Sequence, residues 1–181
     1  MSEPGRAPPS TPEQAIGWLA EQGAHPWLVR HHELVLEAAR LVVDGASRLR
    51  GARFDRALVL MGAALHDAGK LEHPEEMSAP GHRHEEAGRA LLARAGFAPA
   101  IARMAVTHAR WGEPESQLED RLVALADKLW KGKRDQALES ALLDELTALG
   151  AGARWEVFEA LDALSEEVAS GAEDRLARSA V

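Results

Sequence analysis

The chain has 181 residues and a formal net charge of −8, from 29 acidic and 21 basic residues. This length predicts one domain with a proper core, and the acidic balance disfavours nonspecific attraction to nucleic acid. The absence of cysteine excludes disulfides and thiolate metal sites. The N-terminus lacks a signal-peptide pattern, and the apolar run at 57–65 is shorter than the about 20 residues that span a bilayer. We therefore expect a cytoplasmic protein with no membrane segment.

Almost every segment has a helical period, and no segment alternates as a strand. After an expected disordered tail at 1–10, Thr11 and Pro12 read as the start of a helix that ends near Gly23. Pro26 then opens a long second helix to about Arg50. Further helices are predicted at about 54–67, 83–95, 99–109, 117–131, 135–149 and 154–170. The sequence thus predicts one all-α domain at 11–171, a bundle of about seven to eight helices, with a tail at 172–181.

His66 and Asp67 stand side by side where the apolar run at 57–65 ends. Burying an unpaired carboxylate costs several kcal/mol, roughly, even after the protein relaxes. A carboxylate at such a position therefore needs a partner. Asp and His together are oxygen and nitrogen ligands for a divalent metal.

Four other ligand-type residues lie in register with apolar helix faces. His31 is three, four and seven residues from apolar positions on its helix, and His84 heads an apolar stripe. His108 follows an apolar face, and Asp127 falls between apolar residues one turn away on either side. A helical bundle builds a metal centre in this way, from side chains on facing helices.

Each of these residues also has a simpler interpretation. A single histidine on an apolar face is more often a hydrogen-bonded core residue, and a single aspartate more often a cap or an ion-pair partner. The set of six inward polar groups favours the metal centre. Two alternatives stay open, because His32 could replace His31 and His82 could replace His84.

The order of these residues resembles a known family. His31, then His66-Asp67, then Asp127 resembles the H…HD…D signature of the HD superfamily of metal-dependent phosphohydrolases, over about residues 26–134. His84 and His108 are similar to the two additional histidines of branches that hold two metals. The chain departs from the pattern at Ala68, where isoleucine is common. It also lacks a Gly-Tyr-Pro signature after His108, which argues against cyclic-dinucleotide hydrolysis.

The resemblance implies a ligand set. His31, His66, Asp67 and Asp127 would hold one divalent metal, and Asp67 would bridge to a second metal held by His84 and His108. Such ligands suit Mn, Fe, Co, Ni or Zn, with one or two ions per chain. Two ions about 3.5–4 Å apart activate a water for attack on a phosphoester.

Three basic residues are candidates for binding the anionic substrate. Lys70, three residues beyond Asp67, would place a positive charge on a phosphate oxygen, although it could equally be a solvated residue at a helix end. Lys133 and Arg134, in the turn after the helix of Asp127, are candidates for the distal part of the substrate. We expect catalysis to depend on Asp67 and Lys70.

The expected function is hydrolysis of a phosphomonoester or phosphodiester in a small, nucleotide-like molecule. Two alternatives keep the same ligands: a diiron oxygenase that cleaves C–C or C–P bonds, and a non-catalytic module that binds a nucleotide. The absence of tyrosine counts slightly against the oxygenase, since one such branch uses a tyrosine near the iron. A nuclease is disfavoured by the net charge of −8. The closing helices at 135–171 suit either core closure or a homodimer surface.

Overall fold

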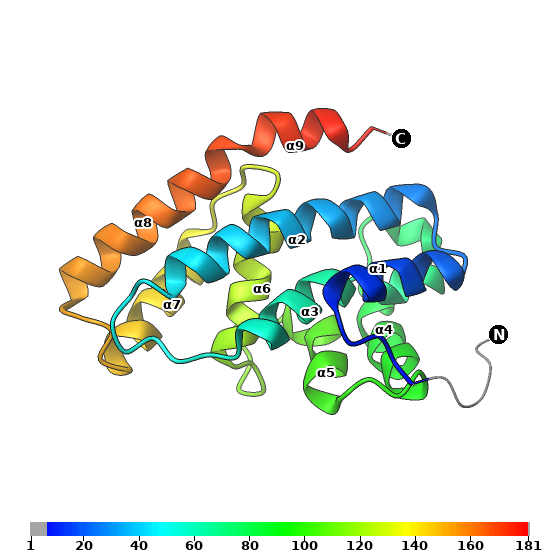
Figure 1. Ribbon diagram of the computed structural model, residues 1–181, viewed down its shortest axis with the longest axis horizontal. Helices are drawn as coiled ribbons and strands as arrows, with labels where there is room; N and C mark the ends of the chain where they lie inside the picture. The colour runs from blue at the N-terminus through cyan, green and yellow to red at the C-terminus, as the bar shows by residue number, and fades with distance from the viewer. Residues whose placement is uncertain (1–6, 181) are drawn as a thin grey trace.

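The computed structural model of the protein describes residues 7–180 (Figure 1). This part of the chain forms nine α-helices and two 3₁₀ helices and contains no strand, which confirms the all-α prediction. The helices are α1 (Pro12–Glu21), α2 (Pro26–Ala46), α3 (Arg56–Leu65), α4 (Arg83–Arg94), α5 (Pro99–Thr107), α6 (Leu118–Leu129), α7 (Gln136–Ala148), α8 (Arg154–Ser170) and α9 (Ala172–Arg178), with the 3₁₀ helices η1 (Ala68–Leu71) and η2 (Pro74–Met77).

Local capping explains where most helices begin. The side chain of Thr11 accepts a hydrogen bond from the backbone N–H of Gln14, and Pro12 occupies the first position of α1, as predicted. The next boundaries differ from the prediction. Helix α3 begins at Arg56 rather than near 54, because the Asp55 side chain caps it by accepting the Leu58 N–H. Helix α2 ends at Ala46 rather than near 50, and the turn that follows contains Gly51 at a φ of 79°.

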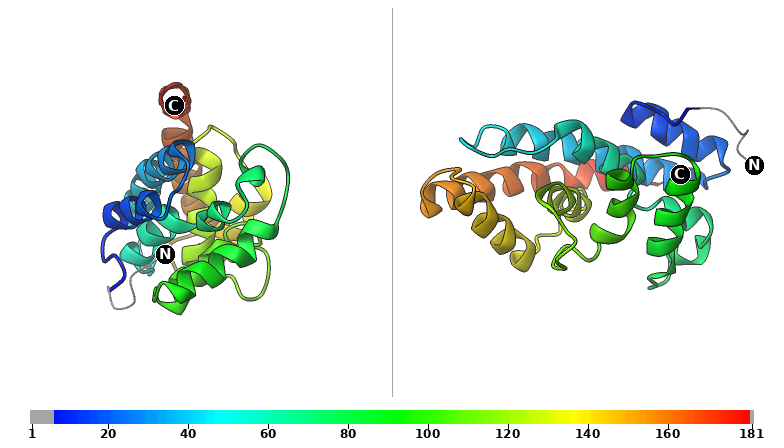
Figure 2. Two further views of the ribbon diagram at one scale, coloured as in Figure 1. Left: turned by 90° about the vertical axis from the view of Figure 1, so that its right-hand side faces the viewer. Right: turned by 90° about the horizontal axis from the view of Figure 1, so that it is seen from below.

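Two apolar clusters lie on either side of the centre of the molecule. One joins α2 and α3 to α6, α7 and α8, and the other joins α2 and α3 to α1, α4 and α5. Figure 2 shows the same division, with α7 and α8 at one end of the long axis and α4 and α5 at the other. Each fully buried leucine side chain in these clusters contributes about 1.5–3 kcal/mol. Helices α2 and α3 therefore support both halves of the protein.

Residues 172–178, which we expected to lie in a tail, form α9. Arg175 anchors this helix with only 2% of its surface exposed. Its guanidinium donates to the carbonyls of Trp130 at 2.9 Å and Leu129 at 3.4 Å, and also to that of Val168. The Trp130 carbonyl lies at the C-cap of α6, beyond the last N–H of that helix, and the Val168 carbonyl lies in the last turn of α8. The Leu129 carbonyl also accepts the Gly132 backbone N–H at 3.0 Å. The expected tail at 1–10 lies mostly outside the described residues, and Ala7–Pro9 contain no helix.

None of the helices within residues 7–180 combines the length and the apolar character needed to cross a membrane.

Glycines set the spacing around the motif that follows α3. A Cβ on Gly69 would lie 1.8 Å from the His84 carbonyl oxygen and 2.5 Å from the Gly88 nitrogen. A Cβ on Gly88 would in turn lie 3.0 Å from the Cβ of Ala105. The backbone of η1 therefore touches the backbone of α4, and α4 touches α5. This contact carries the residues after α3 up to the first turn of α4.

We expect Gly69→Ala to destabilise the protein by about 1–3 kcal/mol, because the added methyl group meets backbone atoms that must move. Chemical denaturation monitored by circular dichroism would measure this loss. Gly112→Ala is the control, since a Cβ there would meet no atom within 4 Å. Equal stability of the two variants would contradict the close contact between η1 and α4.

Candidate metal centre

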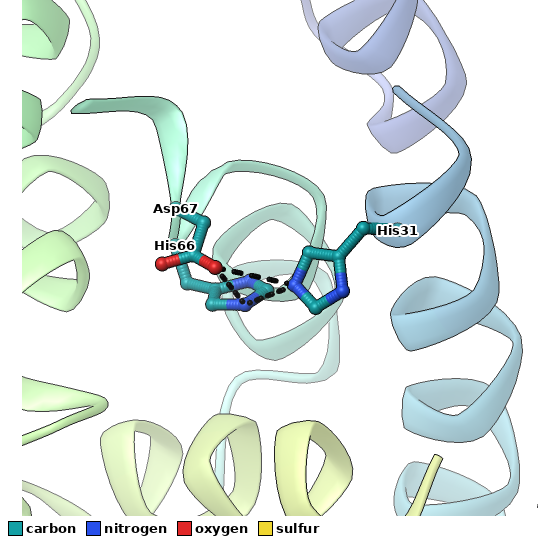
Figure 3. Close-up of side chains that lie close together, drawn as sticks. All are labelled: His31, His66 and Asp67. Atoms are coloured by element: carbon teal, nitrogen blue, oxygen red, sulfur yellow. Dashed lines mark hydrogen bonds and ion pairs between the residues drawn. The ribbon is translucent and has the colours of Figure 1, made fainter. Parts of the chain in front are cut away.

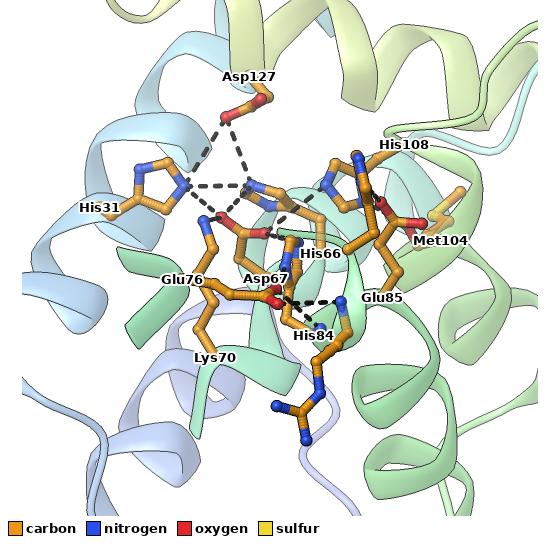
Figure 4. A network of polar contacts seen from close by, with 12 residues as sticks. His31, His66, Asp67, Lys70, Glu76, His84, Glu85, Met104, His108 and Asp127 are labelled. Carbon is orange, nitrogen blue, oxygen red and sulfur yellow. Dashed lines mark hydrogen bonds and ion pairs between the residues drawn. The ribbon is translucent and has the colours of Figure 1, made fainter. Parts of the chain in front are cut away.

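The six predicted ligand residues converge on one point from five segments (Figure 4). His31 lies in the second turn of α2, and His66 and Asp67 lie between α3 and η1. The other three are His84 in the first turn of α4, His108 directly after α5, and Asp127 in the last turn of α6. The four predicted histidine ligands and Asp67 are buried, while the Asp127 side chain keeps 21% of its surface exposed.

One group of ligand atoms gathers around Asp67 Oδ2 (Figure 3). His31 Nε2 lies 3.3 Å from this oxygen and 3.2 Å from His66 Nε2. Asp127 Oδ1 completes the group, at 3.8 Å from His31 Nε2 and 3.5 Å from His66 Nε2. Atoms that bind one ion at about 2.0–2.2 Å lie roughly 3.0–3.5 Å apart at octahedral or tetrahedral angles. The observed separations are close to these values.

A second group gathers around the other oxygen of the same carboxylate. His84 Nε2 lies 3.2 Å from Asp67 Oδ1, and His108 Nε2 lies 3.7 Å from it. Asp67 thus presents one oxygen to each group. A carboxylate placed in this way can bridge two metal ions.

In three of the four histidine ligands, the ring nitrogen away from the ligand atoms (the distal nitrogen, Nδ1) donates a hydrogen bond to a fixed acceptor. His66 Nδ1 donates to the Ala63 carbonyl at 3.0 Å, and His108 Nδ1 donates to the Met104 carbonyl at 2.9 Å. His84 Nδ1 donates to a carboxylate oxygen of Glu76 at 2.6 Å. With the proton on Nδ1, each Nε2 carries the free lone pair that a metal needs. The donor set therefore fits a divalent metal.

His31 and His84, rather than their alternatives, stand among the ligand atoms. His32 is fully buried, but its Nδ1 lies against the Ala63 carbonyl at 3.3 Å, outside both groups. The side chain of His82 is 85% exposed and bonds to Glu85. Both His31 and His32 are buried, but only His31 has a ring nitrogen among the ligand atoms.

The charges in the cluster are mutually stabilising. Burial would raise the pKa of Asp67, but His66, together with the hydrogen bonds from neighbouring histidines, holds it well below its usual range. Asp127 is held low in the same way, by its hydrogen bond with His66 and the charges nearby. Burial lowers the pKa of His31, and it lowers the pKa of His108 to about 4. At neutral pH both carboxylates are ionised and these two imidazoles are neutral, which is the form that binds a metal.

The predicted substrate-binding residues have different surroundings. Lys70 donates to Asp67 Oδ2 at 2.6 Å, so its ammonium group lies at the cluster. Lys133 is exposed on the turn after α6. Arg134 gives its donors to three carboxylates of α7 and α8, at 2.6–2.8 Å: Glu139, Asp162 and Glu166. Its contacts connect the turn to these two helices, and they do not support the expectation that it binds substrate.

Sequence reasoning missed two carboxylates beside the second group. Glu76 lies in a segment that we expected to be a loop, eight residues before the histidine that it contacts. Glu85 is 1% exposed and accepts from Arg110 Nε at 2.7 Å, which ties the first turn of α4 to the segment after His108. One signal in the sequence could have indicated Glu85: it directly follows His84, a predicted ligand.

The fold and this cluster define a helical protein with a buried His/Asp site that could hold metal. The chain matches the HD domain family over residues 28–130, which is more than half of its length and lies within the predicted 26–134. It therefore belongs to the HD-domain family, whose members are typically metal-dependent phosphohydrolases that bind divalent metals. No curated protein and no solved structure gives a significant match to the chain.

We expect Asp67→Ala to lose all bound metal, because Asp67 supplies an oxygen to each group. His84→Ala and His108→Ala should each lose about one ion of two, since they touch only the second group. Elemental mass spectrometry of the purified variants would measure the stoichiometry. Far-ultraviolet circular dichroism would check that the helices are retained. An Asp67→Ala protein that keeps the wild-type metal content would contradict this assignment.

We also expect His108 to contribute a loss of stability to the metal-free protein as the pH falls. The pKa of His108 is about 4 when folded and 6.5 as an ordinary histidine, so between these values the unfolded chain binds the extra proton. Between pH 7 and pH 5 this difference corresponds to a loss on the order of 2 kcal/mol. Urea denaturation in the presence of a chelator would show a smaller loss over the same interval in His108→Leu than in the wild type.

The matched control is His82→Gln, which removes a histidine that is 85% exposed. This variant should keep the wild-type dependence on pH. An unchanged pH dependence in His108→Leu would show that His108 is not held neutral by burial.

Proposed function

We propose that this protein is a two-metal hydrolase that cleaves a P–O ester bond in a small phosphorylated molecule. The observation that carries the proposal is the division of the two Asp67 oxygens between two groups of histidines. A single structural metal would need only one such group. Two divalent ions bound there would supply Lewis acidity to a water and positive charge to the phosphoester oxygens.

The residues of the cluster support hydrolysis through their positions. The Lys70 ammonium lies beside the shared carboxylate. Once bound metal ions neutralise Asp67, this ammonium could donate to a phosphate oxygen instead. The His66 and His108 rings are held by backbone carbonyls, so their lone pairs keep a fixed direction during the reaction. Such preorganisation avoids the cost of reorienting the groups when charge develops on the phosphate.

The open side of the cluster indicates where a substrate would approach. Asp127 and Lys70 are its most exposed members, with 21% and 14% of their side chains accessible. Lys131 contributes to the low pKa of Asp127 and is itself exposed, so its positive charge lies toward the same side. We expect this residue to attract the distal part of an anionic substrate, in place of Arg134. The deep burial of the remaining ligands favours a small substrate.

The test is metal analysis of protein purified without chelator or added metal, together with a screen of phosphomonoesters and phosphodiesters. We expect about two equivalents of transition metal per chain and hydrolysis that a chelator abolishes. Lys70→Met should keep the metal and lose roughly 10²-fold or more in kcat/KM, as removal of one charge-stabilising donor typically does.

The control variant for Lys70→Met is Arg48→Met, which removes an exposed cation of the turn after α2 and should leave kcat/KM near the wild-type value. Two equivalents of iron without hydrolysis would replace the proposal by an oxygenase. No metal under any loading condition would show that the histidines are core residues.

A further inference from the structure

Glu76 is the only carboxylate among the described residues that contacts a distal ring nitrogen of the predicted ligands (Figure 4). Its side chain is 5% exposed. One oxygen, Oε2, accepts from His84 Nδ1 at 2.6 Å and from the His84 backbone N–H at 3.1 Å. The other, Oε1, accepts the Arg83 backbone N–H at 3.1 Å. These donors compensate for most of the loss of hydration that burial of the carboxylate causes.

The three N–H groups hold Glu76 before any metal is considered. Two of them belong to the first turn of α4, where backbone N–H groups have no partner in the helix and the helix dipole favours a negative charge. The carboxylate is therefore fixed to the start of α4. The ring of His84, in the same turn, meets an acceptor whose position is already set.

Gly81 provides the space that the carboxylate occupies. A Cβ on Gly81 would lie 2.2 Å from Glu76 Oε1 and 2.3 Å from its Cδ. Any larger residue at this position would displace the end of the Glu76 side chain. The glycine and the carboxylate thus form one arrangement, although they are five positions apart in the sequence.

The contact determines which nitrogen of His84 is free. A neutral imidazole can carry its proton on either nitrogen, and an ionised acceptor 2.6 Å from Nδ1 keeps it there. His66 and His108 achieve the same result with a neutral backbone carbonyl. His84 alone uses a charged acceptor, which also makes its Nε2 a stronger electron donor.

We propose that Glu76 is a positioning residue for the second metal: it fixes the tautomer and direction of His84 so that Nε2 faces Asp67 Oδ1. This inference rests on the two-metal centre proposed above. It makes the two halves of the centre unequal, because the group of His31 and His66 has no corresponding carboxylate. The second half depends on η2, a short segment outside the bundle helices.

The alternative is that Glu76 serves only as a cap for α4. A cap alone would change stability, whereas a positioning residue would also change the metal affinity of one half. Glu76→Gln removes the charge and keeps the shape, and its single amide oxygen can take the place of Oε2, which accepts the His84 N–H groups, but not of Oε1 at the same time. Gly81→Ala provides an independent route, because it displaces the carboxylate and leaves Glu76 in the sequence.

The first experiment titrates metal-free protein with Co²⁺ and follows the visible spectrum together with the bound stoichiometry. We expect Glu76→Gln, Glu76→Ala and Gly81→Ala to bind the second equivalent about 10- to 100-fold more weakly and the first equivalent as the wild type does. Glu75→Gln is the matched control, because Glu75 belongs to the same η2 helix, is 53% exposed and contacts no predicted ligand. Gly112→Ala is the control for the glycine substitution.

The second experiment needs no metal. Nitrogen-15 NMR of the His84 ring in the chelator-treated protein reports which nitrogen carries the proton. Hydrogen bonds to Asp67 and Glu76 raise the pKa of His84 despite its burial, so the spectra are recorded at a pH high enough to leave the ring neutral. We then expect the proton on Nδ1 in the wild type and in Glu75→Gln, and a mixture of tautomers in Glu76→Ala and Gly81→Ala.

The outcomes separate this inference from the proposed function. Wild-type affinity for both equivalents in all three variants, with only a lowered Tm, would reduce Glu76 to a cap and overturn the inference while the two-metal centre stands. A wild type that binds no second equivalent would overturn the two-metal centre. In that case the His84 tautomer still decides the positioning role, which an unchanged tautomer in Glu76→Ala would refute.

Discussion

The burial of the Asp67 carboxylate is the constraint to which the surrounding structure responds. Only 4% of this residue is exposed, and an isolated charge at such depth would be too unfavourable for a stable fold. The protein resolves this with positive and polar partners from four other segments. Lys70 and His31 approach one oxygen, and His84 and His108 approach the other. The packing of α2 and α5 against α3, and of α4 against η1, is thereby tied to the electrostatics of one side chain.

Close backbone contacts make this arrangement possible. Side chains as short as aspartate and histidine can meet only if the segments that carry them lie unusually near. Gly69 lies against the backbone of His84, and Gly62 lies against the side-chain sulfur of Met104. Both glycines provide that proximity, because a Cβ at either would lie within 2.2 Å of its neighbour. The glycines thus belong to the site as much as the polar residues do, although they contribute no ligand atom.

The sequence predicted most of the helices and the residues that meet at the centre, for a physical reason. Apolar periodicity reports which side of a helix faces the core, and His31, His84, His108 and Asp127 each shared that side with apolar neighbours. Contacts between distant segments leave no such signal. Glu76 lies in a short 3₁₀ helix with no buried apolar residue, and Arg134 looks on sequence like a free cation although three carboxylates hold it. The sequence did not predict helix α9 for a different reason: its seven residues are too few to show a helical period.

The way α9 is held has a consequence for how the protein is made. The carbonyl of Trp130, three residues after Asp127, accepts from Arg175 Nε at 2.9 Å, whereas the Leu129 carbonyl also accepts the Gly132 backbone N–H. During synthesis α6 leaves the ribosome well before that arginine, since domains form from the N-terminal side first. The carbonyl at the C-terminal end of the helix that carries Asp127 therefore gains this hydrogen bond only after Arg175 has been translated. Premature termination before Arg175 would therefore remove the partner of a carbonyl 45 positions upstream, at the end of the helix that carries Asp127.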